Sequence, residues 1–288
     1  MNLCDYNTIR DLLARHGFHF SKSMGQNFLI DPEVPRRIAE ASGADAGCGV
    51  LEIGPGIGPL TAELAQRAGK VVAVELDRAL LPVLAETMAP YPNVEVVPGD
   101  VLKLDLTAIA TEKFQGLTPI VCANLPYNVT SPILEKLVES PCFTAFTVMI
   151  QREVARRLCA PQGSSEGGSF SLFLQYYMKP ELLFDVPPEK FLPAPKVTSA
   201  VIRCVRRERP AVDVADEGFF FKVMRGGFLL RRKTLANSLS AALPGIPKES
   251  IQQAIADMGL PAAVRGEQMT LEDFAALSAA LGREADGD

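Results

Sequence analysis

The sequence of 288 residues predicts an α/β protein with a mostly parallel sheet, followed by a smaller helical region. Two observations support this fold class. Short apolar segments alternate with segments of helical spacing as far as residue 150, which is typical of a doubly wound sheet covered on both faces. Beyond residue 208 only helical spacing remains. Because ligands of such sheets bind at the carboxyl ends of the strands, we expect the functional residues to lie where each strand ends.

The first half of the chain supplies most of the predicted sheet. Helices are expected over 8–17 and 32–41, the second with Pro32 in its first turn, where proline is tolerated. Strands and helices then alternate. The expected strands span 50–53, 70–75, 94–97, 119–123 and 143–150, and the expected helices between the first three are 61–68 and 77–88.

The second half begins with an expected helix over 169–178. Strands over 182–186 and 197–205, joined by a proline-rich connection, predict an antiparallel hairpin that closes one edge of the sheet. An arginine-rich run then predicts a boundary, and we expect domain limits of 1–31, 32–208 and 209–288. The expected helices of the last domain span 217–243, 248–258 and 270–281.

A glycine-rich turn follows the strand over 50–53. Gly54, Gly56 and Gly58 stand where a ligand could approach the backbone closely, although the third glycine of the dinucleotide fingerprint is replaced by Pro59. Glu75 and Asp100 end the next two strands, and carboxylates there can accept hydrogen bonds from ribose hydroxyls and an adenine amine. The alternative is a structural turn with solvated carboxylates. The three features together favour a nucleoside ligand.

The segment Asn124-Leu-Pro-Tyr127 follows the strand over 119–123. An exocyclic adenine amine is a poor nucleophile, and methylating it requires two acceptors that hold the amine and a flat surface that holds the base. The side-chain oxygen of Asn124 and the next backbone carbonyl would supply the acceptors, Pro126 a rigid backbone and Tyr127 the surface. The alternative is a strand that ends in an Asn-Pro turn, with Tyr127 packed on the core.

Composition excludes several classes of protein. The 29 basic and 34 acidic residues give a net charge of −5, which excludes a strongly basic nucleic-acid coat protein but permits a local basic patch. Both histidines, His16 and His19, lie near the N-terminus, which disfavours Ser-His hydrolases and metal sites. The six cysteines form no CxxC pair and are expected to be buried and reduced. Without a membrane-spanning run or a secretory signal, we expect a soluble, cytoplasmic protein.

The glycine turn with its two carboxylates resembles the class I S-adenosylmethionine-dependent methyltransferases, and Asn124–Tyr127 resembles the N-[LI]-P-[YF] motif of adenine-specific RNA methyltransferases. Further segments are similar to the bacterial small-subunit ribosomal RNA adenine dimethyltransferase family along nearly the whole chain. They begin at Gly25, Asn124, Gln151, Pro195, Arg231 and Arg265.

The resemblance implies a seven-stranded class I sheet with a small all-helical C-terminal domain. It also implies that S-adenosylmethionine is the cofactor. Residues 1–31 would form an N-terminal helix and a segment that covers the cofactor. The cofactor would contact Asn27, Leu29, Gly54, Gly56, Glu75, Asp100 and Asn124. The catalytic residues would be Asn124, Leu125, Pro126, Tyr127 and Phe191, where Phe191 stacks on an extruded base or, alternatively, is a core aromatic.

The resemblance further implies dimethylation of two adjacent adenines in the loop of the 3′-terminal hairpin of 16S rRNA, within an assembling 30S subunit. We expect a monomer that needs neither a metal, DNA nor a membrane. Phosphate contacts are expected from a basic face with an acidic reverse side, made by Arg152, Arg156, Arg157, Arg231, Arg232 and Lys233, or these form only a solvated surface. Two alternatives remain: a 23S rRNA methyltransferase of the macrolide-resistance type, and a non-catalytic ribosome-assembly factor.

Overall fold

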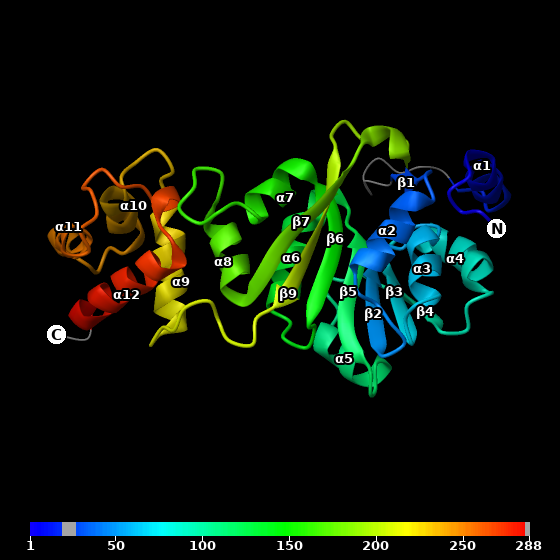
Figure 1. Ribbon diagram of the computed structural model, residues 1–288, viewed down its shortest axis with the longest axis horizontal. Helices are drawn as coiled ribbons and strands as arrows, with labels where there is room; N and C mark the ends of the chain where they lie inside the picture. Colours follow the sequence, from blue (N-terminus) through cyan, green and yellow to red (C-terminus); the bar gives the residue numbers. More distant parts are fainter. Residues whose placement is uncertain (19–26, 286–288) are drawn as a thin grey trace. The chain divides into compact units, whose positions relative to one another are not determined.

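The computed structural model describes residues 1–18 and 27–285, and the helices and strands are labelled in Figure 1. The chain divides into two compact units. The first contains Met1–Ala155 and Pro180–Arg206, and the second contains Arg156–Lys179 and Arg207–Asp288. The predicted domain limits stay a prediction. His19 and the start of the motif at Gly25 lie outside the described residues.

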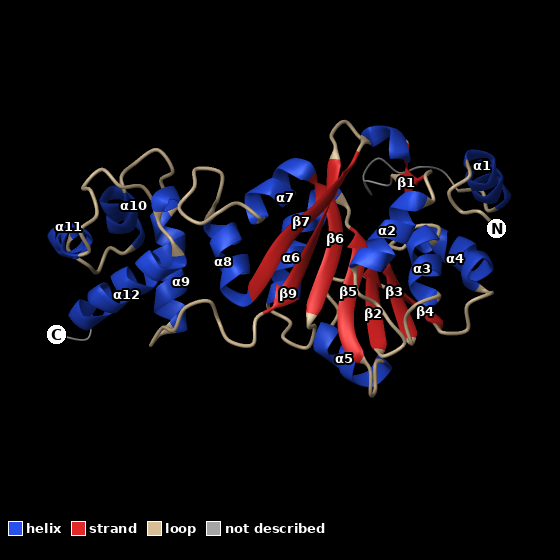
Figure 2. Cartoon of the chain, in the orientation of Figure 1, coloured by secondary structure: helices blue, strands red, loops and turns tan. Residues whose placement is uncertain are grey.

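A seven-stranded sheet organises the first unit, and Figure 2 shows its strands fanned in the order β4-β3-β2-β5-β6-β9-β7. The pairings β2·β3, β2·β5, β3·β4 and β5·β6 are parallel, and β6·β9 is antiparallel. The predicted fold class is therefore confirmed. The strands are β2 Cys48–Ile53, β3 Lys70–Glu75, β4 Val94–Pro98, β5 Thr118–Asn124, β6 Ala145–Gln151, β7 Met178–Val186 and β9 Ser199–Arg206.

The order of the sheet reverses at β2, because β3 and β4 lie on one side of it and β5 and β6 on the other. In open α/β sheets the crevice at such a reversal, outside the carboxyl ends of the strands, is the usual place for a ligand. The strands over 182–186 and 197–205 were predicted at one edge, and β7 and β9 are neighbours there.

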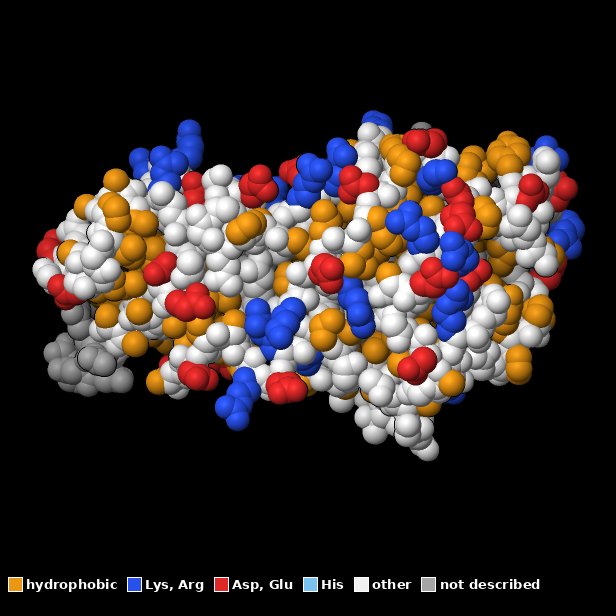
Figure 3. Space-filling model, viewed as in Figure 1, with side chains coloured by type: hydrophobic (Ala, Val, Ile, Leu, Met, Phe, Trp, Pro, Cys, Tyr) orange, Lys and Arg blue, Asp and Glu red, His pale blue; other side chains and the backbone are white. Residues whose placement is uncertain are grey.

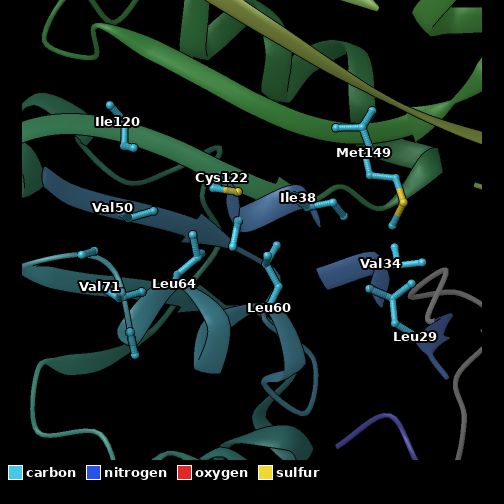
Figure 4. Close-up of a cluster of buried hydrophobic side chains, with 14 of the residues drawn as sticks. Leu29, Val34, Ile38, Val50, Leu60, Leu64, Val71, Ile120, Cys122 and Met149 are labelled. Atoms are coloured by element: carbon cyan, nitrogen blue, oxygen red, sulfur yellow. The ribbon is translucent and has the colours of Figure 1, made fainter. Parts of the chain in front are cut away.

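The first unit also contains helices, the last of which extends into the second unit. They are α1 Tyr6–Arg15, α2 Glu33–Ala41, α3 Pro59–Ala65, α4 Leu81–Met88, α5 Leu106–Lys113, α6 Thr130–Val138 and α7 Arg152–Leu158. Figure 4 shows Ile38 of α2 and Leu64 of α3 beside Val50 and Cys122 of the sheet, in one of the buried apolar clusters. Neither α5 nor α6 was predicted.

A second, two-stranded sheet pairs β1 (Phe28–Leu29) with β8 (Phe191–Leu192) in antiparallel register. It joins segments about 160 positions apart, which explains why no local pattern indicated it. The backbone N–H of Ile30 also donates to the carbonyl of Lys190 at 2.9 Å.

The second unit consists mainly of helices, with an aromatic cluster of Phe173, Tyr176 and Phe220 in its interior. Its helices are α8 Ser169–Tyr177, α9 Glu217–Gly227, α10 Leu235–Ala242, α11 Lys248–Asp257 and α12 Leu271–Ala285. No helix among the described residues is both long enough and apolar enough to cross a membrane.

The prediction of one helix over 217–243 was wrong, because α9 ends at Gly227 and α10 begins at Leu235. Thr234 caps α10, its side chain accepting from the N–H of Asn237 at 3.4 Å. Ser238 holds the intervening turn by accepting from the N–H of Leu230 and donating to the carbonyl of Gly226. The break therefore results from a cap and a buried serine that helical periodicity does not reveal.

All six cysteines are free. Cys4, Cys48, Cys122 and Cys204 are buried as expected, whereas Cys142 and Cys159 are partly exposed. The expectation of burial was therefore wrong for these two, which lie in turns, Cys142 between α6 and β6 and Cys159 directly after α7.

Candidate functional site

A cavity of about 220 Å³ opens at the carboxyl ends of β2, β3, β4 and β5, where the order of the sheet reverses. It brings together predicted site residues that are widely separated in the chain. Its lining includes Asn27, Leu29, Gly54, Gly56, Glu75, Asp100, Asn124, Leu125, Pro126 and Tyr127. Phe191 and the six basic residues are not part of this lining.

Gly54 and Gly56 of the glycine turn line the cavity, and Gly56 and Gly58 require glycine for two different reasons. Gly56 has a φ of +64°, and a Cβ there would lie 3.3 Å from the ring of Phe28, so a side chain would be strained and crowded. Gly58 has a φ of +95°, and a Cβ there would lie 2.5 Å from Met88 Cε. Gly56 therefore lets Phe28, another residue of the lining, lie close to the turn, whereas Gly58 permits the packing of α3 against α4.

Glu75, at the end of β3, is held before any ligand arrives. Its Oε1 accepts from the N–H of Asp77 at 2.7 Å and its Oε2 from the N–H of Gly56 at 3.3 Å. The side chain is buried, and burial raises its pKa despite these hydrogen bonds, which act in the opposite direction. A carboxylate oriented in this way can accept further hydrogen bonds from neighbouring hydroxyl groups of a ligand.

Asp100 and the turn that follows it form the wall after β4. Asp100 Oδ1 accepts from the N–H of Leu102 at 3.0 Å, and the carbonyl of Asp100 accepts from the N–H of Lys103 at 2.9 Å. The side chain is only partly buried. One carboxylate oxygen thus organises the turn while the group still borders the cavity.

Glu52 also lines the cavity and was missed by the sequence analysis. It is 1% exposed, and its Oε2 has no hydrogen-bond partner among the described residues. Burial, with a smaller contribution from the charge of Glu75, raises its pKa to about 8. The available signal was a single carboxylate within an apolar strand, where it is expensive unless it is neutral or paired.

The segment Asn124–Tyr127 leaves the sheet at the end of β5. The N–H of Leu125 still donates to the carbonyl of Met149 at 3.1 Å, and a 3-10 helix then runs over Tyr127–Val129. The hydroxyl of Tyr127 hydrogen-bonds Ser199 Oγ of β9 at 2.5 Å, and burial raises the pKa of that hydroxyl. Ser199 therefore fixes the ring from across the sheet, a role that the sequence analysis missed.

Phe191 occupies the position of a core aromatic, the alternative considered above. It is 3% exposed and belongs to an apolar cluster with Leu29, Val186 and Val201. Its backbone nevertheless connects to the cavity, because β8 pairs Phe191 with Leu29, which lines it. Stacking of Phe191 on a base stays a prediction that requires the ring to become accessible.

The six basic residues lie on two segments. Arg152 of α7 pairs with Asp185 at 3.4 Å, whereas Arg156 and Arg157 are exposed at the end of the same helix. Arg231, Arg232 and Lys233 are all exposed in the segment between α9 and α10, not on a helix as predicted. Figure 3 shows acidic and basic side chains side by side over α2 and α3, where Arg36 pairs with Glu33 and Glu40. This part of the surface is mixed in charge, and it contains none of the six residues proposed to contact phosphates, so the basic face stays a prediction.

The cavity combines a glycine turn, carboxylates after two strands and an amide after a third. Carboxylates accept hydrogen bonds from hydroxyls and amines, and the glycine turn admits a flat or extended ligand close to the backbone. This combination suits a nucleoside that carries a polar tail. Among the described residues there is no group of three or more His, Cys, Asp or Glu side chains placed to hold a metal ion.

Comparison with known proteins gives consistent matches over most of the chain. The family model for ribosomal RNA adenine dimethylase matches residues 17–277. The ribosomal RNA small subunit methyltransferases A of Bacillus mycoides and Bacillus cereus are each 48% identical over 279 residues, covering 96% of this chain and 96% of theirs.

Solved structures match as well. The 23S rRNA methyltransferase ErmE is 27% identical, with a TM-score of 0.67 over 89% of this chain and 100% of its own. A dimethyladenosine transferase from Plasmodium falciparum is 24% identical, with a TM-score of 0.76 over 89% of this chain and 98% of its own, and therefore supports the fold alone.

Proposed function

The chain belongs to the ribosomal RNA adenine dimethylase family and is an S-adenosylmethionine-dependent methyltransferase; from this premise we propose that it dimethylates two adjacent adenines of 16S rRNA. The target is the loop of the 3′-terminal hairpin, and the substrate is an assembling 30S subunit. The observation that carries this proposal is the meeting of Glu75, Asp100 and Asn124 around one cavity, within a chain about half identical to small-subunit enzymes.

The cavity fits S-adenosylmethionine. The oriented carboxylate of Glu75 would accept both ribose hydroxyls, and Asp100 would accept from the adenine amine. Gly54 and Gly56, with Asn27 and Leu29 opposite, would enclose the rest of the molecule. The buried Oε2 of Glu52, which has no hydrogen-bond partner among the described residues, borders the same space and could hydrogen-bond a polar group of the cofactor. When bound, the cofactor supplies an electrophilic methyl group on a sulfonium.

The acceptor amine would be held by residues at the end of β5. The side-chain oxygen of Asn124 and the carbonyl of Leu125 would each accept one N–H of the adenine amine, which favours a tetrahedral nitrogen with an available lone pair. Pro126 keeps this backbone rigid, because its ring fixes φ and it carries no competing N–H. Tyr127, anchored by Ser199, would provide the surface on which the base stacks.

A base within a structured loop must leave its stack to reach this position. Phe191 would cover the other face of the extruded base. Arg152, Arg156, Arg157, Arg231, Arg232 and Lys233 would contact phosphates and so position the RNA without reading its sequence. We further propose that the protein works as a cytoplasmic monomer and that it needs neither a metal nor DNA.

The proposal is tested by offering the purified protein unmethylated 30S particles, 23S rRNA and buffer alone, with a radiolabelled methyl donor. We expect label only in the 30S particles, with dimethyladenine mapped to two adjacent positions. Label confined to 23S rRNA would make the protein an enzyme of the macrolide-resistance type. Binding of 30S particles without any label would make it a non-catalytic assembly factor.

A further inference from the structure

Lys136 lies on α6 and is not part of the lining of the cavity. Its ammonium group donates to two backbone carbonyls of a different segment, Leu102 at 2.8 Å and Leu104 at 2.6 Å. These residues belong to the turn that follows Asp100. Lys136 therefore connects the helix that follows Asn124–Tyr127 to the wall that follows β4.

The turn that Lys136 holds carries part of the cavity wall. Gly99, Asp100, Val101 and Leu102 all line the cavity. The turn is tied back to Asp100 by the N–H groups of Lys103 and Leu104, which donate to the carbonyl of Asp100 at 2.9 and 3.2 Å. Nothing in this segment is a regular helix or strand, so its shape depends on such individual hydrogen bonds.

The start of helix α6 lies beside the Asn124–Tyr127 segment. Ile133, one helical turn before Lys136, lines the cavity, as does Val129 just before the helix. The hydroxyl of Thr130, the first residue of α6, donates to the carbonyl of Pro126 at 3.0 Å. Helix α6 is thus fixed to the Asn124–Tyr127 segment at its start and to the Asp100 turn at Lys136.

We propose that Lys136 is a positioning residue that sets the Asp100 wall of the cavity relative to the Asn124–Tyr127 segment. Its contribution is to cofactor affinity, because a loose turn must be ordered each time the adenine end binds, at a cost in conformational entropy. A lysine suits this role, since its ammonium group can donate to two carbonyls at once. This inference rests on the proposed function, in which Asp100 accepts from the cofactor's adenine.

The test compares Lys136→Met with wild type by calorimetric binding of S-adenosylhomocysteine and by steady-state kinetics on 30S particles. Methionine keeps the length of the side chain but removes its donors. Because hydrogen bonds to charged groups are the stronger ones, we expect affinity to fall about tenfold or more. KM for the cofactor should rise by a similar factor, while kcat at saturation stays within about twofold.

Two further variants separate positioning from general destabilisation. Lys136→Arg retains donors for both carbonyls and should recover most of the affinity. Lys113→Met is the matched control, because it also removes a lysine hydrogen bond, here to Glu95 at 2.6 Å on β4, but leaves the Asp100 turn untouched. Hydrogen exchange should show lost protection at the amides of Leu102, Lys103 and Leu104 in Lys136→Met alone.

Unchanged affinity in Lys136→Met would overturn the inference. So would a loss that Lys136→Arg fails to restore, or one that Lys113→Met reproduces. If wild type itself failed to bind S-adenosylhomocysteine, the proposed function would fail first, and the inference would fall with it. The two failures are therefore distinguishable.

Discussion

The cavity at the strand ends and the segment between α9 and α10 hold their charged groups in opposite ways. In the cavity, Glu75 is buried and receives two backbone N–H groups, so its position is set before a ligand arrives. In the segment, Arg231, Arg232 and Lys233 are exposed. A buried, oriented group selects a ligand by geometry, whereas exposed cations attract polyanions with little regard to sequence.

This difference predicts how substitutions behave in the two regions. Within the cavity, replacing a single acceptor atom should cause a large loss, and that loss should affect either cofactor binding or methyl transfer but not both equally. In the exposed segment, effects should be smaller, graded with the number of charges removed and sensitive to salt.

Asn124→Ala should show the largest effect. The substitution removes the acceptor proposed to hold the adenine amine in the transition state, and losses of such groups lower kcat by roughly 10²- to 10³-fold. S-adenosylhomocysteine should still bind within a modest factor, because Glu75 and Asp100 remain. Methyl transfer to 30S particles and calorimetric binding, measured on the same preparation, check this prediction. Full transfer activity in the variant would refute the amine-holding role.

Glu75→Gln should weaken S-adenosylhomocysteine binding by about 100-fold, because two charge-assisted hydrogen bonds to ribose hydroxyls would be replaced by weaker ones. Calorimetry gives the affinity directly. Asp77→Asn is the control, since it alters a neighbouring carboxylate that also lines the cavity but has no proposed ribose contact. Equal losses in both variants would show that charge alone, and not the orientation of Glu75, is responsible.

Wild type and Glu75→Gln should also differ in how their affinity for S-adenosylhomocysteine depends on pH. Burial raises the pKa of Glu75 above its ordinary value, so the carboxyl takes up a proton as the pH falls through that raised pKa. The protonated form loses acceptor capacity, and wild-type affinity should therefore fall as the pH is lowered from neutral toward 4.5, the ordinary pKa of a glutamate. Glu75→Gln should lack this component of the pH profile.

The cavity was also the region most open to prediction from sequence. Gly56 and Asp100 follow strands, Glu75 and Asn124 end them, and parallel strands bring their carboxyl ends to one edge of a sheet. Lys136 and Ser199 were missed because they act through hydrogen bonds to residues distant in the chain. The burial of Phe191 likewise depends on β8 pairing with β1, which no local pattern specifies.

Removing one charge at a time from the exposed segment should have a smaller effect. Arg231→Ala, Arg232→Ala and Lys233→Ala should each reduce RNA affinity only a few-fold, and the triple variant should reduce it about tenfold. Each lost phosphate contact should also lower the slope of log affinity against log salt by about 0.7 to 0.9. Lys248→Ala, at the exposed start of α11 in the same unit, is the control. If the singles changed affinity without changing the salt slope, direct phosphate contact would be excluded.

The helix break that places these residues was beyond the sequence analysis. Helical spacing continues across residues 228–234, but the chain turns there. The turn is held by the hydrogen bonds of Ser238, the cap at Thr234 and the N–H of Leu235, which donates to the carbonyl of Val264 at 2.7 Å. Arg231, Arg232 and Lys233 were therefore expected on a helix, whereas they lie in the segment between two helices. Surface charges lack the burial pattern that makes strand ends predictable.

The smallest expected effect is a change in thermal stability. It arises from the burial of the Glu52 carboxyl group beside the cavity. Glu52 has a pKa of about 8 in the folded chain, against an ordinary value of 4.5. Between these values the folded chain keeps a proton that the unfolded chain has released, so the free energy of unfolding falls as the pH rises through this window. Glu52→Gln stays neutral and should melt at least about 3 °C above wild type at pH 9, with little difference at pH 4.

Glu95→Gln is the control in which the melting temperature should change in the opposite direction. Because Lys113 and Lys70 lower the pKa of Glu95, this variant should melt below wild type at neutral pH. Parallel melting profiles for wild type and Glu52→Gln from pH 4 to 9 would mean that Glu52 finds a partner that offsets its burial.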